Sequence, residues 1–325
     1  MFSAWREALV QETGSLWGPL SLLVVGALLS TQPVHATESP YTVLLGVAQD
    51  AGHPQAGCKK SCCAAAWADP SLGHRVVSLG VLDPVSNQRW LIDASPDFPR
   101  QLMALETAQS SEGASVLDGI FLTHGHIGHY TGLLHLGREV MGTQDVPVYV
   151  MPRMEQFLRR FGPWEQLVRL GNVKLVGLEA GREVQLNERI RVEAFSVPHR
   201  DEYTETVGFI VSGPTQRVLY LPDIDKWERW ERPIESLIAE VDRAYVDGTF
   251  FDGKELPGRD MAEIPHPFVV ESLARFASLP EQERNKVRFI HFNHTNPLLQ
   301  PDSDPVDQVR AAGMHVAQEA ERFEF

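Results

Sequence analysis

Three histidines directly follow an apolar run at residues 120–122, and this placement constrains the fold more than any other feature of the chain. They are His124, His126 and His129, in the stretch Thr-His-Gly-His-Ile-Gly-His. Because alternate residues at a strand end point the same way, His124 and His126 can share one space, and a following helix would carry His129 close by. The spacing predicts a metal centre on a strand, turn and helix; the alternative is a set of ordinary polar loop residues.

The acidic balance of the chain argues against nucleic acid as a partner. The 325 residues include 29 basic and 43 acidic side chains, a formal net charge of −14, which would repel a phosphate backbone unless local patches intervened. The length allows a sizeable core, in one large domain or two small ones. A small-molecule substrate is the expected partner, and the sequence leaves the oligomeric state open.

The N-terminus is typical of an export signal. An apolar run from Leu16 to Leu29 ends near Val34-His35-Ala36, a small-residue pattern that resembles a signal-peptidase site. Because the run is short for a bilayer span, residues 1–36 are predicted to be a signal peptide, with an uncleaved membrane anchor as the alternative. The folded part, residues 41–325, would then be periplasmic or secreted and would meet a membrane only through an uncleaved leader.

Acidic and histidine residues recur where predicted strands end. The residues are Asp93, His199, Asp223 and His291, and their strands are predicted at 89–92, 189–197, 216–221 and 287–292. Helices are predicted at 98–107, 130–141, 154–160, 227–240 and 267–277. The pattern favours two strand-rich halves packed into one domain over two independent domains.

The three cysteines lie within six residues, at Cys58, Cys62 and Cys63. Their odd number excludes a closed disulfide framework, and their close spacing favours thiolate ligands of a metal. The alternatives are small buried residues, or one disulfide and a free thiol in an oxidising compartment.

Together these residues resemble the metallo-β-lactamase superfamily, from Tyr41 to the C-terminus. The motifs fall in the family's order: Asp93, His-x-His-x-Gly-His at 124–129, His199, Asp223 and His291. Within the superfamily, the PqqB subgroup (pyrroloquinoline-quinone biosynthesis protein B) is similar in four places: Gly-His-Pro-Gln at 52–55, the cysteine cluster, the stretch 129–140 and the ending at 291–297. The resemblance implies an α/β fold, a four-layer αββα sandwich with two mixed sheets.

The resemblance also implies a set of metal ligands. A first ion would be held by His124, His126 and His199, and a second by His129 and His291, with Asp223 bridging both. Asp93 would hydrogen-bond an imidazole N–H and thereby fix its tautomer. Neutral imidazoles and carboxylates at a strand edge suit one or two Zn²⁺ ions, with Mn²⁺ or Fe²⁺ as alternatives.

Gly128 departs from the pattern of the family that the chain resembles. Most hydrolytic members carry an aspartate there, which ligates the second metal and steers the attacking hydroxide. Without that carboxylate, the second site keeps two imidazoles and a shared Asp223. The sequence therefore predicts high occupancy of the first site and partial occupancy of the second.

The chemistry that the resemblance implies is metal-assisted hydrolysis, in which the cation lowers the pKa of bound water from about 16 to about 7. Asp223 would orient the hydroxide. His266 stands where related phosphodiesterases place a helper histidine, and it would protonate the leaving atom. The alternative role for His266 is to cap the helix that follows.

Similarity to a related cyclic phosphodiesterase implies that Cys58, Cys62, Cys63 and His294 form a structural zinc site. The spacing here is Cys-x₃-Cys-Cys, whereas that subgroup usually has Cys-x-Cys-x₂-Cys, so the adjacent Cys62 and Cys63 need not both bind the ion.

Asp50 and His53 lie in a Gly- and Pro-containing loop that could fold over the metal edge, and both are predicted to contact substrate. A structural role is expected for His74, His135 and His315, while His35 belongs to the leader.

We expect an exported metal-dependent hydrolase of an ester, lactone, amide or phosphodiester. The alternative, favoured by Gly128, is a non-hydrolytic metal-binding factor in the biosynthesis or transport of pyrroloquinoline quinone. An RNase Z-like nuclease is disfavoured by the net charge and the export signal. Quinone biosynthesis is expected in the cytosol, so either the leader is misread or the chain is a paralogue with a periplasmic substrate.

Overall fold

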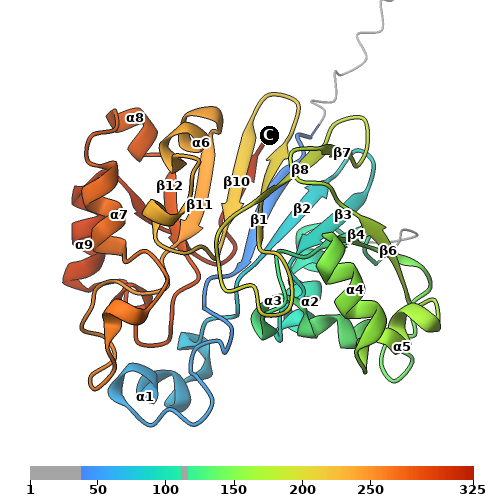
Figure 1. Cartoon of the computed structure of the whole chain (residues 1–325), viewed down its shortest axis with the longest axis horizontal. Coiled ribbons are helices and arrows are strands. Elements are labelled where there is room, and N and C mark those ends of the chain that lie inside the picture. The colour runs from blue at the N-terminus through green and yellow to red at the C-terminus, as the bar shows by residue number, and fades with distance from the viewer. Residues whose placement is uncertain (1–37, 111–115) are drawn as a thin grey trace, which may run out of the picture. The chain divides into compact units, whose positions relative to one another are not determined.

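Two mixed sheets lie face to face in the computed structural model, which describes residues 38–110 and 116–325 (Figure 1). The predicted leader, residues 1–36, lies outside the described residues. Within the described ranges, every helix is too short or too polar to cross a membrane.

The first sheet has seven strands. In spatial order they are β14 (Arg322–Glu324), β1 (Tyr41–Gly46), β2 (Ser78–Asp83), β3 (Gln88–Ile92), β4 (Gly119–Phe121), β5 (Val146–Val150) and β6 (Val173–Gly177). Strands β14 to β3 pair antiparallel, and strands β3 to β6 pair parallel. The sheet is therefore mixed, as predicted.

The second sheet repeats this arrangement. Its strands, in spatial order, are β13 (His315–Val316), β12 (Val287–Ile290), β11 (Arg243–Asp247), β10 (Arg217–Leu221), β9 (Val207–Ser212), β8 (Arg191–Ser196) and β7 (Glu183–Gln185). Strands β10 to β13 pair parallel, and β7 to β10 pair antiparallel.

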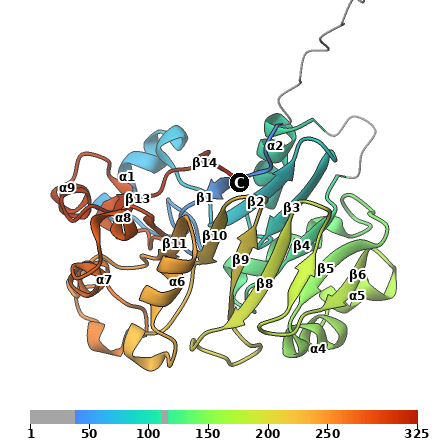
Figure 2. The same cartoon turned by 90° about the horizontal axis from the view of Figure 1, so that it is seen from above.

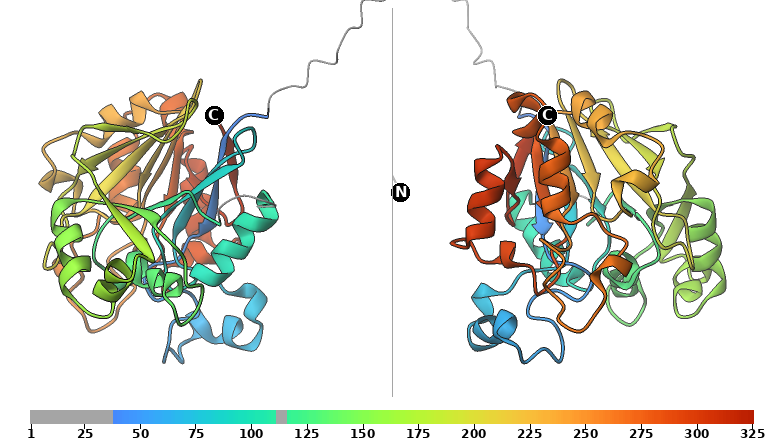
Figure 3. Two further views of the ribbon diagram at one scale, coloured as in Figure 1. Left: turned by 90° about the vertical axis from the view of Figure 1, so that its right-hand side faces the viewer. Right: turned by 60° about the vertical axis from the view of Figure 1, so that its left-hand side comes forward.

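Helices cover the outer faces of both sheets (Figure 2). The first sheet is covered by α2 (Phe98–Ala108), α4 (Pro152–Arg160) and α5 (Trp164–Arg169), and the second by α6 (Ile234–Glu240), α7 (Val269–Phe276), α8 (Glu281–Arg284) and α9 (Asp304–Ala311). Helix α1 (Ser61–Ala68), which carries two of the cysteines, stands beyond one end of the sandwich (Figure 3). The four-layer αββα architecture predicted from the resemblance is confirmed.

The core follows the two-residue period of the strands. In β1, Val43 and Leu45 pack with the helices of the first outer layer, whereas Leu44 between them packs in the cluster shared by the two sheets. The same alternation puts Ile120 on the outer face of β4 and Phe121 on the inner face. Successive side chains of a strand point to opposite faces, so each central strand is apolar on both sides.

The helix predicted at 130–141 is wrong in extent. The chain forms a short α3 (Ile127–Tyr130) and then a 3₁₀ segment, Thr131–Leu136. Gly132 donates its N–H to Ala94 O, and a Cβ at Gly132 would lie 2.3 Å from Ser95 O. This close backbone approach ties the turn to the segment after β3 and takes the place of a regular helix.

The helix predicted at 227–240 divides into a 3₁₀ turn, Trp227–Arg229, and α6, which begins at Ile234. Pro233 stands between them, directly before α6. Because proline lacks an N–H and disfavours helical backbone in the residue before it, the turn cannot continue into the helix.

Candidate metal centre

The predicted ligands meet because the strands that carry them end at one edge of the sandwich. Strands β3 and β4 are parallel, and so are β10, β11 and β12, so their carboxyl ends lie together within each sheet. Asp93 directly follows β3, and His291 directly follows β12. Both adopt a left-handed backbone, with φ of 66° and 65°. Non-glycine residues adopt this conformation at a cost of roughly 1–2 kcal/mol. Backbone strain of this kind clusters at functional sites.

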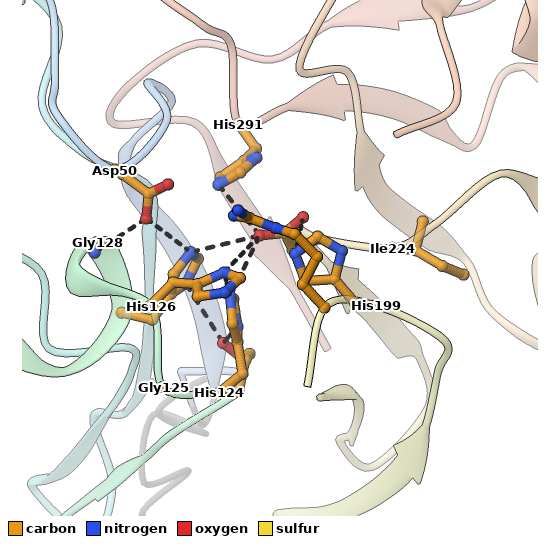
Figure 4. Close-up of polar contacts among 12 residues, drawn as sticks. Asp50, His124, Gly125, His126, Gly128, His199, Ile224 and His291 are labelled. Atoms are coloured by element: carbon orange, nitrogen blue, oxygen red, sulfur yellow. Dashed lines mark hydrogen bonds and ion pairs between the residues drawn. The ribbon is translucent and has the colours of Figure 1, made fainter. Parts of the chain in front are cut away.

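Four of the predicted ligands form the first group: His124, His126, His199 and Asp223 (Figure 4). His124 Nε2 lies 2.8 Å from His126 Nδ1 and 3.2 Å from Asp223 Oδ2. His199 Nε2 lies 3.2 Å from the other carboxylate oxygen of Asp223. His126 turns its Nδ1 to the group, while its Nε2 lies 3.5 Å from Glu202.

The second group contains His129 and His291, as predicted, and it also contains Asp50. Asp50 Oδ1 lies 3.8 Å from His129 Nε2 and accepts a hydrogen bond of 3.0 Å from the N–H of Gly128 (Figure 4). Asp223 Oδ2 is 4.0 Å from His129 Nε2 and 3.9 Å from His291 Nε2. Asp223 therefore lies between the two groups, the position that the sequence assigned to it.

Unpaired buried atoms provide a test of whether these residues fit a metal. His129 Nε2, His199 Nε2, His291 Nε2 and Asp223 Oδ1 are buried without a hydrogen-bond partner of acceptable geometry. An unsatisfied buried polar atom costs about 1–3 kcal/mol, so four that converge on one place need a common partner. Imidazole nitrogens and a carboxylate oxygen are the ligands that divalent zinc prefers, and the residues fit such an ion.

Asp93 holds the first sheet's histidines in place. Its Oδ2 lies 2.8 Å from His129 Nδ1, and its Oδ1 accepts hydrogen bonds from the N–H and Oγ1 of Thr123 at 2.9 Å each. Thr123 Oγ1 is also 3.0 Å from His124 Nδ1. These contacts direct the Nε2 atoms of His124 and His129 into the centre, which is the role predicted for Asp93.

Asp247 and Thr249 do the same for the second sheet. Thr249 Oγ1 donates to Asp247 Oδ1 at 2.7 Å and lies 2.9 Å from His291 Nδ1. Asp225 Oδ1 is 3.3 Å from His199 Nδ1. The sequence reasoning named none of Thr123, Asp225, Asp247 and Thr249 as site residues. The available signal was their position at or within four residues after the ends of β4, β10 and β11.

The structure brings His266 into the centre. Its Nδ1 lies 2.8 Å from Asp247 Oδ2 and 3.1 Å from Asp223 Oδ1, and the residue is 4% exposed. Helix α7 is preceded by Phe268, not by His266. His266 therefore does not cap this helix, and the helper role stays a prediction.

Burial and the carboxylates of the centre set the charges of its own side chains. Burial opposes the charged form of His129, but the nearby Asp93 outweighs burial and raises its pKa to about 9. Burial likewise opposes charging of His199, but Asp223 raises its pKa to about 10. Burial and neighbouring His129 hold the pKa of His124 well below its ordinary value. Burial disfavours ionised Asp223, but the surrounding imidazoles, His199 first, hold its pKa well below the ordinary value.

The cysteine cluster lies apart from this centre. Cys58, Cys62, Cys63 and His294 place one ligand atom each within 4.8 Å of one another. Cys58 Sγ and Cys62 Sγ are 3.8 Å apart, and all three thiols are free. Burial raises the pKa of the Cys63 thiol to about 12. The adjacent Cys62 and Cys63 both place their Sγ atoms in this group, so the unusual spacing excludes neither of them as a ligand.

The two loop residues predicted to contact substrate separate in the structure. Asp50 lines a cavity of about 450 Å³ beside His126. His53 instead lies 2.9 Å, through Nε2, from the carbonyl oxygen of Cys62, and its ring packs near His74. That contact places His53 with the cysteine loop, so a substrate role for it stays a prediction without support from the geometry.

The other histidines lie away from the centre. His135 stacks on Phe98, with ring centroids 5.8 Å apart, and His315 Nε2 lies 2.7 Å from Asn285 Oδ1. His74 lies 3.8 Å from Glu319.

The fold and the site define a metallo-β-lactamase-type protein, and the comparison with known families agrees. A family model described as "Beta-lactamase superfamily domain" matches residues 88–312. The chain belongs to this superfamily.

Among curated proteins, the chain is similar to coenzyme PQQ synthesis protein B of Methylorubrum extorquens (strain PA1). The two are 29% identical over 310 residues, which cover 85% of this chain and 97% of that protein. Among solved structures, it is similar to Zn²⁺-bound PqqB from Methylobacterium extorquens, with a TM-score of 0.75, 24% identity and coverage of 88% and 100%. It is also similar to a diphosphatase from the PhnP family, with a TM-score of 0.62, 20% identity and coverage of 88% and 97%.

Proposed function

We propose that the chain is a metal-dependent hydrolase that acts on a small-molecule ester, lactone, amide or phosphodiester. The observation that carries this proposal is the convergence of four buried ligand atoms at one edge of the sandwich, none of which has a hydrogen bond of acceptable geometry. They belong to His129, His199, His291 and Asp223. A structural site would be closed by its ligands, whereas this edge opens onto a cavity of about 450 Å³.

Each residue of the centre has a role in this chemistry. His124, His126 and His199 would hold one divalent cation, which supplies Lewis-acid polarisation and activates water when bound. Asp223 presents carboxylate oxygens to both groups and can orient the attacking water by accepting a hydrogen bond from it.

His266 is suited to protonate the leaving atom. Burial opposes its charged form, but Asp247 outweighs burial and raises the pKa of His266. Its Nδ1 faces Asp247 Oδ2 at 2.8 Å, so Nε2 is the nitrogen left to give a proton.

The cavity beside the centre favours a substrate with an apolar or aromatic part. Its lining is mostly apolar and aromatic, with one cation: Asp50, Gly125, His126, Ile127, Tyr130, Phe157, Phe161, Arg200 and Tyr203. Phe161 and Tyr203 are 55% and 60% exposed, an arrangement in which ring faces remain open to a ligand. We expect Phe161→Ala to raise KM for an aromatic ester more than for an acetyl ester of the same alcohol.

Turnover by metal-loaded protein tests the proposal. Metal-stripped protein is reloaded with Zn²⁺, Mn²⁺ or Fe²⁺ and assayed with chromogenic esters, lactones, β-lactams and bis-nitrophenyl phosphate. The expected result is metal-dependent turnover that His126→Ala abolishes and His315→Ala, a histidine outside the centre, retains. Protein that binds its ions but turns over none of these substrates would contradict it.

A second candidate, a non-hydrolytic factor that handles pyrroloquinoline quinone or its precursor, is favoured by the relative named coenzyme PQQ synthesis protein B, which the chain matches over 97% of its length. It predicts metal-dependent binding of the quinone, seen by absorbance titration, without hydrolysis of any substrate in the panel. The predicted export to the periplasm or cell exterior bears on this candidate, because quinone biosynthesis is expected in the cytosol. N-terminal sequencing of mature protein would show whether residues 1–36 are removed.

A further inference from the structure

The loop after β1 places a carboxylate where Gly128 has no side chain. A Cβ built on Gly128 would lie 2.5 Å from Asp50 Oδ1 and 2.6 Å from Asp50 Cα. Real Cβ atoms do not approach backbone atoms so closely, so any side chain at position 128 would displace the loop. The absence of a side chain at Gly128 and the position of Asp50 are therefore one coupled feature.

Backbone hydrogen bonds hold this loop beside the second histidine group. Gln49 donates its N–H to Phe292 O at 2.8 Å, and Phe292 donates its N–H to Val47 O at 2.8 Å. Phe292 directly follows His291, so the segment that carries this histidine also fixes the loop that carries Asp50. The Gly128 N–H, at 3.0 Å from Oδ1, then orients the carboxylate.

Among the residues that the structure describes, Asp50 is the acid that groups with His129 and His291. His129 Nε2 and His291 Nε2 are buried and unpaired, and Asp50 Oδ1 lies 3.8 Å from the former. Ligands bound to zinc at about 2.0–2.2 Å in a tetrahedron lie roughly 3.3–3.6 Å from one another, close to this separation. The Asp50 side chain is 20% exposed, so it faces the centre with little competition from water.

We propose that Asp50 is a ligand of the second metal ion, together with His129, His291 and the shared Asp223. This inference rests on the proposed metal-dependent function. It replaces the sequence expectation that the second site is weak for lack of a carboxylate: the acid comes from the loop after β1 rather than from the histidine motif.

The test counts ions and measures their affinities without using activity. Metal-stripped wild type, Asp50→Asn and Asp307→Asn are titrated with Zn²⁺ by calorimetry, and bound zinc is counted by mass spectrometry after desalting. Asparagine keeps the hydrogen bond from Gly128 but removes the charge. Asp307→Asn removes a carboxylate that is 73% exposed on α9 and contacts none of the histidine ligands, and so controls for net charge.

We expect Asp50→Asn to bind one ion fewer than wild type, or to bind the second ion at least 10-fold more weakly, while Asp307→Asn matches wild type. Gly128→Ala should lose the same ion because its Cβ displaces the loop, with retention of the first ion showing that the chain is folded. An unchanged zinc count and affinity in Asp50→Asn would overturn the proposal for Asp50. Wild type that binds no ion at the histidine centre would instead overturn the proposed function.

Discussion

The histidine centre and the cysteine cluster of this chain are both groups of candidate metal ligands, but they are assembled from different parts of the sequence. The centre gathers side chains from the ends of β3, β4, β8, β10 and β12, almost 200 residues apart in sequence, in a buried place. The cluster takes three thiols from six consecutive residues, 58–63, and one imidazole from His294, and three of its four residues are partly exposed. The centre depends on the packing of two sheets, whereas the cluster depends on one loop and on its contact with the segment after β12.

The difference also extends to the groups around the ligands. In the histidine centre each imidazole has a carboxylate or hydroxyl behind it, such as Asp93 behind His129 and Thr249 behind His291. In the cysteine cluster, the thiols meet mainly each other, and His294 Nδ1 lies 3.2 Å from Asn293 Oδ1. We therefore expect the centre to keep its geometry without an ion, and the cluster to need an ion to complete it.

The largest effect is expected when Asp223 is replaced, because its oxygens lie near both histidine groups. Asp223→Ala should lower zinc affinity at the centre by more than about 100-fold, beyond the 10–100-fold typical for residues that only position ligands. Zinc at the cysteine cluster should remain, so one ion stays bound. Zinc counting checks this, with Asp201→Ala, an acid 73% exposed, as the control. If Asp223→Ala bound as much zinc as wild type, zinc at the histidine centre would not depend on Asp223, and the proposed difference between the two regions would be wrong.

Cys58→Ser removes one thiol from the cysteine cluster and leaves the histidine centre intact. Loss of one thiolate should release one zinc and lower the melting temperature by several degrees, because a structural ion binds the folded chain and not the unfolded one. The ions of the histidine centre should stay. The exposed neighbour Lys59→Ala is the control. Unchanged zinc with lost activity would show that the cluster serves catalysis instead.

Asp93→Asn tests how much the hydrogen-bond partners of the ligands contribute to zinc affinity. The amide cannot support the His129 tautomer as a carboxylate does, so zinc affinity at the second group should fall about 10- to 100-fold. Competition with a chromogenic chelator measures this change. An affinity within about twofold of wild type would mean that the strand end alone orients the histidine.

The smallest effect concerns the loop that carries His294. Glu255 accepts hydrogen bonds from the N–H groups of Phe251 and Asp252 and, at 3.0 Å, from Thr295 Oγ1 beside His294. Burial raises its pKa to about 7. The folded chain therefore binds this proton more tightly than the unfolded chain, and stability falls as pH rises from about 4.5 through 7.

Glu255→Gln should abolish that decline. Relative to wild type, its stability should gain on the order of 1 kcal/mol between pH 5 and pH 8, after allowance for partial exposure. Urea unfolding at both pH values measures the difference, and Glu263→Gln, on an exposed turn, is the control. A parallel pH dependence in wild type and Glu255→Gln would exclude Glu255 as its source.

The sequence by itself was sufficient to predict the fold and to predict that most of the proposed ligands meet at one edge. Two-residue periodicity indicated the strands, and each of Asp93, His124, His199, Asp223 and His291 follows a recognisable strand. Because parallel strands put their carboxyl ends at one edge, position in the sequence was enough to predict that these side chains meet. The points where predicted helices end were harder to predict from the sequence. The turn around Gly132, for example, depends on contact with Ala94, far earlier in the chain.

Only the tertiary structure decided what replaces the missing carboxylate. Position 128 alone indicated a deficient second site, and Asp50 alone indicated a loop residue that might touch substrate. Their relation is a contact across 78 residues, set by the hydrogen bonds between the loop after β1 and the segment after β12. No local pattern encodes such a contact, because it depends on how the strand ends are brought together rather than on the residues that surround either position.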